Sequence, residues 1–330
     1  MRHLVKCSFF LFMFIQAFIV HADRALLHQR NTQFFIRDMV NHYNFDKKQL
    51  IAILNESVFQ PQIIESMDRP YEKKNWDVYK ALFLTPARVE AGVEFWRTNQ
   101  KTLEQVQKQY GVPADMIVAI IGVETLYGKN QGKYRVLDAL TTLAFHYPKR
   151  SEFFTKELRE YLLLCREQRV SATKYLGSYA GAIGKPQFMP SSYRFYAIDF
   201  NGKGQADLMS EDQDVISSVA NYFAKHGWKN NEVVAEPALI AGDAYKQLTM
   251  NSKTPDYSFR HLLEVGVKPE QSKMSHPGQA GVIELLTDNG AEYWLAYPNF
   301  YVITHYNTSP QYALVVYLLS QQLREHVTSV

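Results

Sequence analysis

The chain has 330 residues, of which 46% are hydrophobic and 21% are charged. It is therefore long enough for two or three packed units and too apolar for a disordered or low-complexity protein. The formal net charge of +3 is too small for a nucleic-acid-binding surface, so we expect no nucleic acid among its partners. The 21 tyrosines are expected mostly to fill the core and its rim, although such rings also suit flat polar ligands such as sugars.

The first predicted element is a targeting segment at residues 1–22. Arg2 and Lys6 precede an apolar run that extends from Phe9 to Val20, and a small residue follows at Ala22. This order is typical of a secretory signal peptide, and the run is short for a membrane span. An uncleaved anchor helix is the alternative interpretation.

Both cysteines bear on the cellular compartment. Cys7 precedes the apolar run, so the chain has no lipobox and is not predicted to be a lipoprotein. Removal of residues 1–22 leaves Cys165 alone, without a partner for an internal disulfide, and we expect it to be a buried apolar filler. An exported, nearly neutral chain without disulfides indicates a periplasmic protein.

Residues 23–110 are predicted to form helices. Within them, Thr85 and Pro86 are typical of a helix start, with threonine as the N-cap and proline in the first helical position. A further helix is expected from Ser309 to His326.

Residues 229–298 have a different character, because prolines and glycines break them into short pieces. Residues 281–286 and 291–296 resemble strands, and the Asp-Asn-Gly turn signal at 288–290 separates them. The chain is therefore expected to be mainly helical (α+β), with a small β domain.

The segment 111–128 predicts a buried helix that ends in one acid. Pro113 lies near its start and Gly128 after its end, and no side chain from Met116 to Val123 is polar. Glu124 follows this run near the helix C-terminus, where desolvation and the helix dipole both raise the pKa of a carboxyl group. A carboxylic acid that is still protonated near neutral pH can donate a proton to a glycosidic oxygen. The alternative is a structural glutamate paired with Lys129, Lys133 or Arg135.

A glycine-rich segment at 177–193 packs glycines between apolar residues. Ser178, Tyr179 and Gln187 offer neutral hydrogen-bonding groups suited to hydroxyl or acetamido groups. The segment lacks the Gly-Lys-Ser/Thr ending of a phosphate-binding P-loop. It is equally compatible with a tightly packed structural turn.

These motifs together resemble one known family, the membrane-bound lytic murein transglycosylase B family. The likeness runs from about Tyr79 to the C-terminus. It rests on the strings IGVET at 121–125, GSYAGA at 177–182, QFMPSSY at 187–193, SSVANYF at 217–223 and HGW at 226–228.

The resemblance implies a lysozyme-like catalytic core at 111–228, a helical domain at 23–110 that is completed by 299–330, and a small β domain at 229–298. It also implies cleavage of the β-1,4 bond between N-acetylmuramic acid and N-acetylglucosamine in peptidoglycan, with formation of 1,6-anhydromuramic acid ends. Glu124 matches the family's single catalytic acid/base. The implied partners are peptidoglycan glycan strands, with cell-wall synthesis proteins as further candidates, and we expect a periplasmic monomer.

Two other functions stay open at this stage. Ordinary glycosidases use two carboxylates about the scissile bond, and no second acid stands in a motif comparable to that of Glu124. A hydrolytic muramidase would need a distant acid to fold into the site. A non-catalytic peptidoglycan-binding scaffold protein would need no acid at all, and the presence of Glu124, Ser178 and Gln187 argues against it.

The resemblance also assigns substrate-binding positions, each of which could instead be ordinary aromatic packing or a surface charge. Arg150 resembles a position near the stem peptide of the substrate, where a cation could meet a carboxylate. The complete set of substrate-binding candidates is Tyr79, Arg150, Ser178, Gln187, Tyr222, Tyr306, Asn307 and Tyr312.

A calcium site is implied at an EF-hand-like loop within residues 199–214. Asp199 and Asn201 fit its first and third positions, and Asp214 resembles the final ligand. Lys203 stands where an Asp or Asn ligand belongs, and its ammonium group opposes a divalent cation. We therefore expect no required cofactor, and we expect Lys203 to replace the metal in part by pairing with Asp199 or Asp214.

Overall fold

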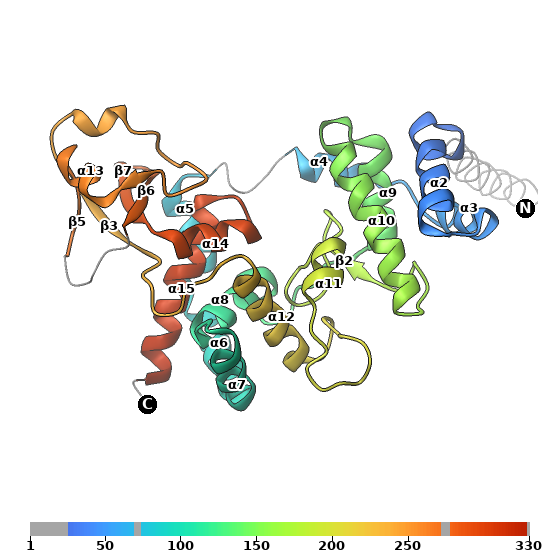
Figure 1. Cartoon of the computed structure of the whole chain (residues 1–330), viewed down its shortest axis with the longest axis horizontal. Coiled ribbons are helices and arrows are strands. Elements are labelled where there is room, and N and C mark those ends of the chain that lie inside the picture. The colour runs from blue at the N-terminus through green and yellow to red at the C-terminus, as the bar shows by residue number, and fades with distance from the viewer. Residues whose placement is uncertain (1–25, 69–73, 272–277, 329–330) are drawn as a thin grey trace, which may run out of the picture. The chain divides into compact units, whose positions relative to one another are not determined.

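The structure is a computed structural model that describes residues 26–68, 74–271 and 278–328, so the predicted signal peptide lies outside the described residues. The chain divides into two compact units (Figure 1). Of the described residues, the first unit contains 26–68 together with 131–195, and the second contains 74–130, 196–271 and 278–328. Four parts with other boundaries are expected from the sequence. That four-part division stays a prediction.

The first unit is helical. Its main packing contact joins α9 and α10, and α4 also packs on α9. Its elements are α2 (Arg30–Tyr43), α3 (Lys47–Asn55), α4 (Pro61–Met67), β1 (Tyr134–Arg135), α9 (Val136–His146), α10 (Ser151–Glu167), β2 (Leu176–Gly177) and α11 (Pro190–Tyr196). The two short strands pair antiparallel and tie the glycine-rich segment to the start of α9.

The second unit is built around one buried helix, α8, which contacts α6, α7, α12 and α15 (Figure 1). Its helices are α5 (Trp76–Phe83), α6 (Pro86–Thr98), α7 (Gln100–Tyr110), α8 (Ala114–Thr125), α12 (Asp212–Lys225), α13 (Phe259–Glu264), α14 (Pro298–Tyr306) and α15 (Pro310–Thr328). The C-terminal helix α15 thus lies beside α8 although almost 200 residues separate them in the sequence.

A five-stranded sheet in the order β4-β6-β7-β3-β5 completes the second unit. Its strands are β3 (Ala235–Ile240), β4 (Tyr257–Ser258), β5 (Val267–Pro269), β6 (Gln279–Thr287) and β7 (Gly290–Ala296). The expected hairpin is confirmed, because β6 and β7 pair antiparallel from Gly281 opposite Ala296 to Thr287 opposite Gly290. A separate apolar core, which includes Leu262, Val282 and Tyr297, holds α13 against this sheet.

The expected fold class, mainly helical with a small sheet, is confirmed. The helix start at α6 is also as predicted, since Thr85 accepts a hydrogen bond from the Arg88 backbone N–H at 3.3 Å and Pro86 occupies the first helical position. None of the helices in the described ranges is long and apolar enough to span a membrane.

The remaining cysteine is buried, as expected. Cys165 lies in α10 with 3% of its surface exposed. Burial raises the pKa of its thiol to about 11. A thiol that stays protonated at neutral pH is a poor nucleophile, so Cys165 has a packing role.

Candidate active site

Helix α8 is apolar along its length and buried on all sides, as the sequence predicts. Every residue from Met116 to Val123 is buried, and so is Thr125. Glu124 alone in the last turn is partly exposed. The fold therefore delivers one carboxyl group to a position that is surrounded by apolar packing but open on one side.

The pKa of Glu124 is raised to about 7, mainly by desolvation. The hydroxyl of Tyr312, which donates a hydrogen bond to Glu124 Oε1, opposes this rise. A carboxyl group with this pKa exists in both protonation states at neutral pH, so it can give up a proton and later accept one. The pairing with Lys129, Lys133 or Arg135 is absent from the ion pairs of the described residues.

Replacing Tyr312 by phenylalanine is expected to raise the pKa of Glu124 by about one unit, because a hydrogen bond to the charged carboxylate is lost. The fall in kcat/KM with rising pH, which marks loss of the acid form, should move to higher pH by the same amount. Tyr317→Phe, on the same helix α15, is the matched control and should leave the profile in place. An unchanged profile in Tyr312→Phe would contradict the assigned hydrogen bond.

Three further predicted tyrosines gather around this pair in the second unit. Desolvation and the charge of Glu124 both raise the pKa of Tyr306, and the nearby Tyr222 adds to the effect. The rings of Tyr222 and Tyr306 meet edge to face with their centroids 4.9 Å apart. Tyr79 acts electrostatically on Tyr312 and packs against Trp76 and Phe83.

These tyrosines are more deeply buried than the sequence suggests for a sugar-binding surface. Tyr79 is 2% exposed, Tyr312 4% and Tyr222 7%. The hydroxyl of Tyr222 donates to the backbone carbonyl of His305 at 2.7 Å. Within the second unit these rings therefore support Glu124 and each other, and Tyr306 is the member with more of its surface exposed.

Asn307 shapes the chain between α14 and α15. Its side-chain oxygen accepts a hydrogen bond from the Ser309 backbone N–H at 3.0 Å, directly before α15 begins. This local bond is typical of a polar residue at a turn. Asn307 therefore helps to set the spacing between Tyr306, at the end of α14, and Tyr312, in the first turns of α15.

The end of α8 agrees with the sequence-based expectation, because Glu124 lies in the last turn and Gly128 follows the helix. The helix ends at Thr125, and Leu126 and Tyr127 both adopt left-handed backbone conformations, with φ of 51° and 57°, before Gly128. The Tyr127 ring lies between α8 and α6, close to a glycine of each helix. A Cβ atom at Gly122 or Gly92 would lie 2.4 Å or 2.2 Å from the Tyr127 hydroxyl oxygen.

Ser178 and Gln187 belong to the first unit, where both shape the glycine-rich segment. The hydroxyl of Ser178 accepts a hydrogen bond from the Ala182 backbone N–H at 3.1 Å. The side-chain amide of Gln187 donates to the carbonyls of Gly184 and Gln131, at 2.9 and 3.1 Å. Their expected roles toward substrate stay predictions.

Close backbone approach explains the glycines of this segment, as the sequence suggests. A Cβ atom at Gly177 would lie 2.2 Å from the Ala182 carbonyl oxygen, and one at Gly181 would lie 2.5 Å from a Leu140 methyl carbon. Gly181 also has a positive φ of 83°. The segment is therefore a tightly packed turn, and this packing does not depend on any role in binding substrate.

Arg150 also lies in the first unit, directly before α10. Its guanidinium carbon is 4.4 Å from the ring centroid of Phe153 and 5.1 Å from that of Phe154. The side chain is exposed. Stacking on aromatic rings holds the cation at the surface, where it is available to an anionic group.

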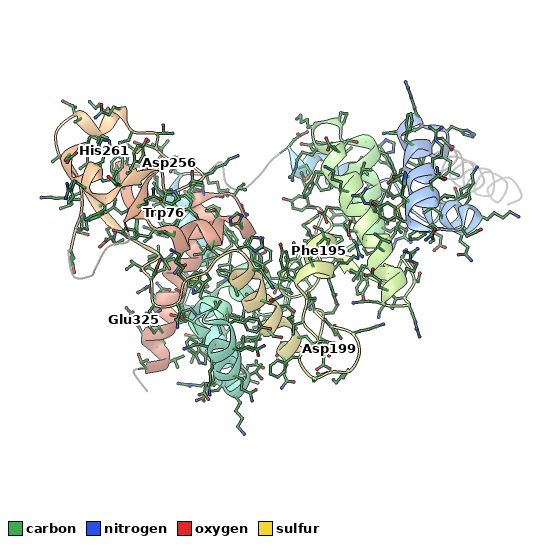
Figure 2. All side chains as sticks on the ribbon, in the orientation of Figure 1. Trp76, Phe195, Asp199, Asp256, His261 and Glu325 are labelled. Atoms are coloured by element: carbon green, nitrogen blue, oxygen red, sulfur yellow. The ribbon has the colours of Figure 1, made fainter. Side chains whose placement is uncertain are left out.

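The EF-hand-like loop lies between α11 and α12, and backbone N–H groups donate hydrogen bonds to its predicted acidic ligands. Asp199, labelled in Figure 2, accepts hydrogen bonds from the backbone N–H groups of Lys203 and Gly204 at 3.0 and 2.6 Å. Asp214 accepts from those of Phe200 and Asp207 at 2.9 and 2.8 Å. No group of three or more His, Cys, Asp and Glu side chains in the described part of the chain is arranged to hold a metal ion. Calcium needs six to eight oxygen ligands, and Lys203 supplies a positive charge instead.

The partner expected for Lys203 is wrong. Its ammonium group pairs with Glu211, with Nζ 3.0 Å from Oε1, and Asp199 and Asp214 act on it only at longer range. The backbone N–H groups already engage both aspartates, so the long lysine side chain extends to the carboxylate at the start of α12. The pair lies at the protein surface.

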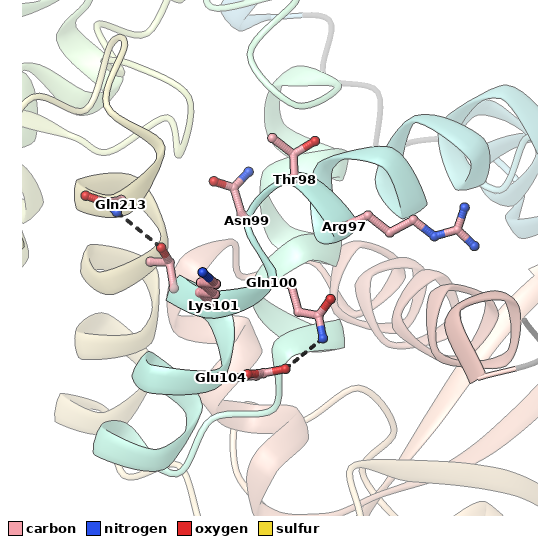
Figure 3. A pocket seen from close by; sticks show the side chains of 8 residues that line it. Arg97, Thr98, Asn99, Gln100, Lys101, Glu104 and Gln213 are labelled. Carbon is pink, nitrogen blue, oxygen red and sulfur yellow. Dashed lines mark hydrogen bonds between the residues drawn. The ribbon is translucent and has the colours of Figure 1, made fainter.

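A surface depression of about 640 Å³ lies where α6 meets α7 (Figure 3). All eight of its lining residues are polar, and they include Arg97, Lys101 and Glu104. Gln213 of α12 closes one side through a 3.4 Å hydrogen bond to Thr102. None of the predicted site residues lines it, so it is not the expected substrate cleft.

A helical core with one acid of raised pKa, together with a small sheet, is the arrangement that the resemblance to the lytic murein transglycosylases implies. The family model described as the transglycosylase SLT domain matches residues 28–321. The chain therefore belongs to the SLT transglycosylase family.

Known relatives agree with this assignment. The chain is 42% identical over 301 residues to the membrane-bound lytic murein transglycosylase B of Escherichia coli K12, covering 88% of this chain and 82% of the relative. The soluble lytic transglycosylase SltB1 of Pseudomonas aeruginosa has a similar structure, with a TM-score of 0.81, 42% identity and coverage of 88% and 97%. The E. coli lytic transglycosylase Slt35, solved in complex with calcium, gives a TM-score of 0.82 at 41% identity and coverage of 91% and 95%. The lysozyme-like lytic transglycosylase fold is thus confirmed.

Proposed function

We propose that this protein is a peptidoglycan lytic transglycosylase. It cleaves the β-1,4 bond between N-acetylmuramic acid and N-acetylglucosamine and leaves 1,6-anhydromuramic acid ends. Membership of the SLT transglycosylase family supports this reaction class. The observation that carries the proposal for this chain is Glu124, whose pKa is raised to about 7 at the end of a buried helix.

In the first step, the protonated Glu124 carboxyl group gives its proton to the glycosidic oxygen as the bond between muramic C1 and that oxygen breaks. In the second step, the Glu124 carboxylate accepts the proton of the muramic C6 hydroxyl as O6 bonds to C1. The acid returns to its starting state, and no water is consumed. Because the nucleophile belongs to the substrate, one carboxyl group serves both steps.

The surroundings of Glu124 favour a mechanism in which this one carboxyl group acts as both acid and base. Desolvation and Tyr312 are the causes that shift its pKa, and no described carboxylate is among them. Ordinary glycosidases place two carboxyl groups within about 5–9 Å of each other. The hydrolytic alternative, in which a second carboxylate activates water, therefore has less support.

Substrate contacts by the other predicted residues belong to the same proposal. In the second unit, Tyr312 donates a hydrogen bond to the acid and Tyr306 lies within reach of its charge. Tyr222 packs on Tyr306, Tyr79 acts on Tyr312, and Asn307 follows Tyr306 in the chain. From the first unit, Ser178 and Gln187 would offer hydrogen bonds to sugar groups, and the exposed Arg150 would meet a carboxylate of the stem peptide.

Product analysis tests the proposed reaction. The purified chain is incubated with peptidoglycan sacculi, and the released muropeptides are analysed by mass spectrometry. Anhydromuropeptides are expected, 18 mass units lighter than the hydrolytic products, because an internal hydroxyl replaces water. Products with reducing ends would assign the chain to the hydrolytic muramidases instead, and binding without any product would assign it to the scaffold proteins.

We further propose that the enzyme is exported by the signal peptide at 1–22 and acts in the periplasm as a monomer. A murein substrate is found outside the cytoplasm, which agrees with export. Any contact with cell-wall synthesis proteins belongs to the same proposal.

We also propose that the loop at 199–214 works without calcium. Isothermal titration of the metal-stripped protein is expected to show no submillimolar Ca²⁺ binding, because Lys203 holds the position of a ligand and pairs with Glu211. Lys203→Asp should create or strengthen Ca²⁺ binding, whereas Lys246→Asp, at another exposed lysine, should not. Submillimolar binding by the unmodified protein would refute this proposal.

A further inference from the structure

Arg88 connects the ends of two helices that carry predicted site residues. It lies in the first turn of α6, and its Nη1 donates to the carbonyl oxygens of Leu82 and Phe83 at 2.8 and 2.7 Å. Its Nε donates to the carbonyl oxygen of Gly122 at 3.2 Å. Leu82 and Phe83 end α5, which carries Tyr79, and Gly122 lies two residues before Glu124 in α8.

The carbonyl groups of Leu82 and Phe83 belong to the last turn of α5, where they have no intrahelical donor, and Gly122 lies in the last turn of α8. The partial negative charge at a helix C-terminus also favours a cation there. Arg88 is half-buried, and its guanidinium carbon lies 5.1 Å from the Phe83 ring centroid. A rigid, forked cation is therefore held between α5 and α8 by three hydrogen bonds and one ring.

The surrounding packing shows that this junction has little freedom. The Tyr127 ring contacts both Gly92 of α6 and Gly122 of α8, and it stacks on Phe95 with centroids 5.6 Å apart. The Gly122 carbonyl accepts the Leu126 backbone N–H at 3.1 Å in addition to Arg88. A shift of the guanidinium would thus disturb the last turn of α8, which contains Glu124.

We propose that Arg88 is a positioning residue for the transglycosylation reaction, fixing Glu124 and Tyr79 relative to each other through the ends of α8 and α5. The inference rests on the proposed function of Glu124 as the acid/base. Arg88 holds the backbone and has no role as a proton donor. Arg88 therefore affects the position of the Glu124 carboxyl group in the chemical step. A displacement of a catalytic group by about 1 Å can lower the rate about 100-fold.

The fork geometry matters more than the charge. An arginine side chain presents several donors in a fixed plane, whereas lysine offers one flexible ammonium group. Arg88→Lys therefore keeps the cation but cannot bridge three carbonyl oxygens on two helices. Arg88→Met removes the charge and the donors while keeping much of the apolar stem.

The test compares Arg88→Met and Arg88→Lys with Arg324→Met, which removes another arginine bound to α8, at the opposite end of that helix. Each protein is assayed at least 15 °C below its own midpoint of thermal unfolding, on a soluble tetrasaccharide of alternating N-acetylglucosamine and N-acetylmuramic acid. We expect kcat to fall 10- to 100-fold in Arg88→Met and about tenfold in Arg88→Lys, with KM within threefold of the parent. Arg324→Met should keep kcat within threefold.

A purely structural role would instead lower the unfolding midpoint of the Arg88 variants and leave kcat of the folded protein unchanged, and that result would overturn the proposal. A rise in KM without a fall in kcat would overturn it as well. If Arg88→Met does not fold, Arg88→Lys tests the proposal in its place, with the same comparison of kcat, KM and the unfolding midpoint. Failure of the proposed function can be told apart from failure of the Arg88 proposal. In that case the parent protein itself would release no anhydromuropeptides.

Discussion

Replacing Glu124 by glutamine is expected to reduce the release of anhydromuropeptides from sacculi at least about 1,000-fold, because one group is proposed to serve as both acid and base. Glutamine preserves the size of the side chain and leaves an oxygen that can accept the Tyr312 hydrogen bond. It has no proton to give to the leaving oxygen. The measurement is the rate of product release, followed by mass spectrometry over several hours.

The stability of the same variant supplies an internal control. The pKa of Glu124 in the folded protein, about 7, lies above the ordinary value of 4.5, so the folded protein binds the proton more tightly than the unfolded chain. Stability is therefore lost as pH rises from about 4.5 through about 7. Glu124→Gln avoids this loss, and we expect it to be more stable than the parent by about 2 kcal/mol at pH 8, a value reduced for the partial exposure of the carboxyl group.

Glu94→Gln, at an exposed glutamate of α6, is the matched control and should change neither activity nor the pH dependence of stability. An inactive Glu124→Gln with raised stability at pH 8 would show that a functional group was lost while the fold was kept. Activity within tenfold of the parent would mean that another residue supplies the proton, and the assignment of the acid would then be wrong.

The position and the altered pKa of Glu124 could be predicted from the sequence because both follow from local pattern. An uninterrupted apolar run from Met116 to Val123 can only be buried, and a carboxyl group next in the chain is then desolvated at a helix C-terminus. The packing of the Tyr127 ring after α8 could not be predicted in this way. It needs the glycine at position 92, which lies in another helix, α6.

Contacts made by long side chains were the least predictable part of the site. The helix-start motif at Thr85 and Pro86 predicts no partner for the Arg88 side chain, because its three carbonyl partners are brought together only by the packing of α5 and α8 on α6. The sequence predicts the wrong carboxylates for Lys203, because no side-chain pattern reveals that backbone N–H groups engage Asp199 and Asp214. Tyr312 was expected near the acid only from family resemblance, since it lies on a helix distant in sequence.

The largest effect on stability is expected at the other end of α8. Asp115, in the first turn, is 2% exposed, and its carboxylate accepts a hydrogen bond from Arg324 Nε at 2.6 Å. Arg324→Met removes this cation and leaves a buried carboxylate with its bond to the Met116 backbone N–H. Breaking a buried pair costs about 3–5 kcal/mol, and because the Arg324 side chain is half-exposed we expect a loss of about 2–3 kcal/mol near pH 7, measured by urea denaturation.

The loss of stability in Arg324→Met should depend on pH in a defined direction. Burial raises the pKa of Asp115 in spite of Arg324, and removal of the arginine raises it further. A carboxyl group with a raised folded pKa destabilises the protein as pH rises above its unfolded value, near 3.8. The difference between Arg324→Met and the parent should therefore be largest at neutral pH and should shrink toward pH 4.

A double-mutant cycle separates the ion pair from general packing. In an Asp115→Asn background, Arg324→Met should cost less than about 1 kcal/mol, because no buried charge is left unpaired. An equal cost in both backgrounds would assign the effect to the arginine stem.

Asp115 lies roughly 13 Å along the helix from Glu124 at 1.5 Å per residue, so this bond should stabilise the junction of α15 with α8 while leaving kcat nearly unchanged. The two arginines bound to α8 would then differ in function: Arg324 stabilises the fold, and Arg88 positions the acid.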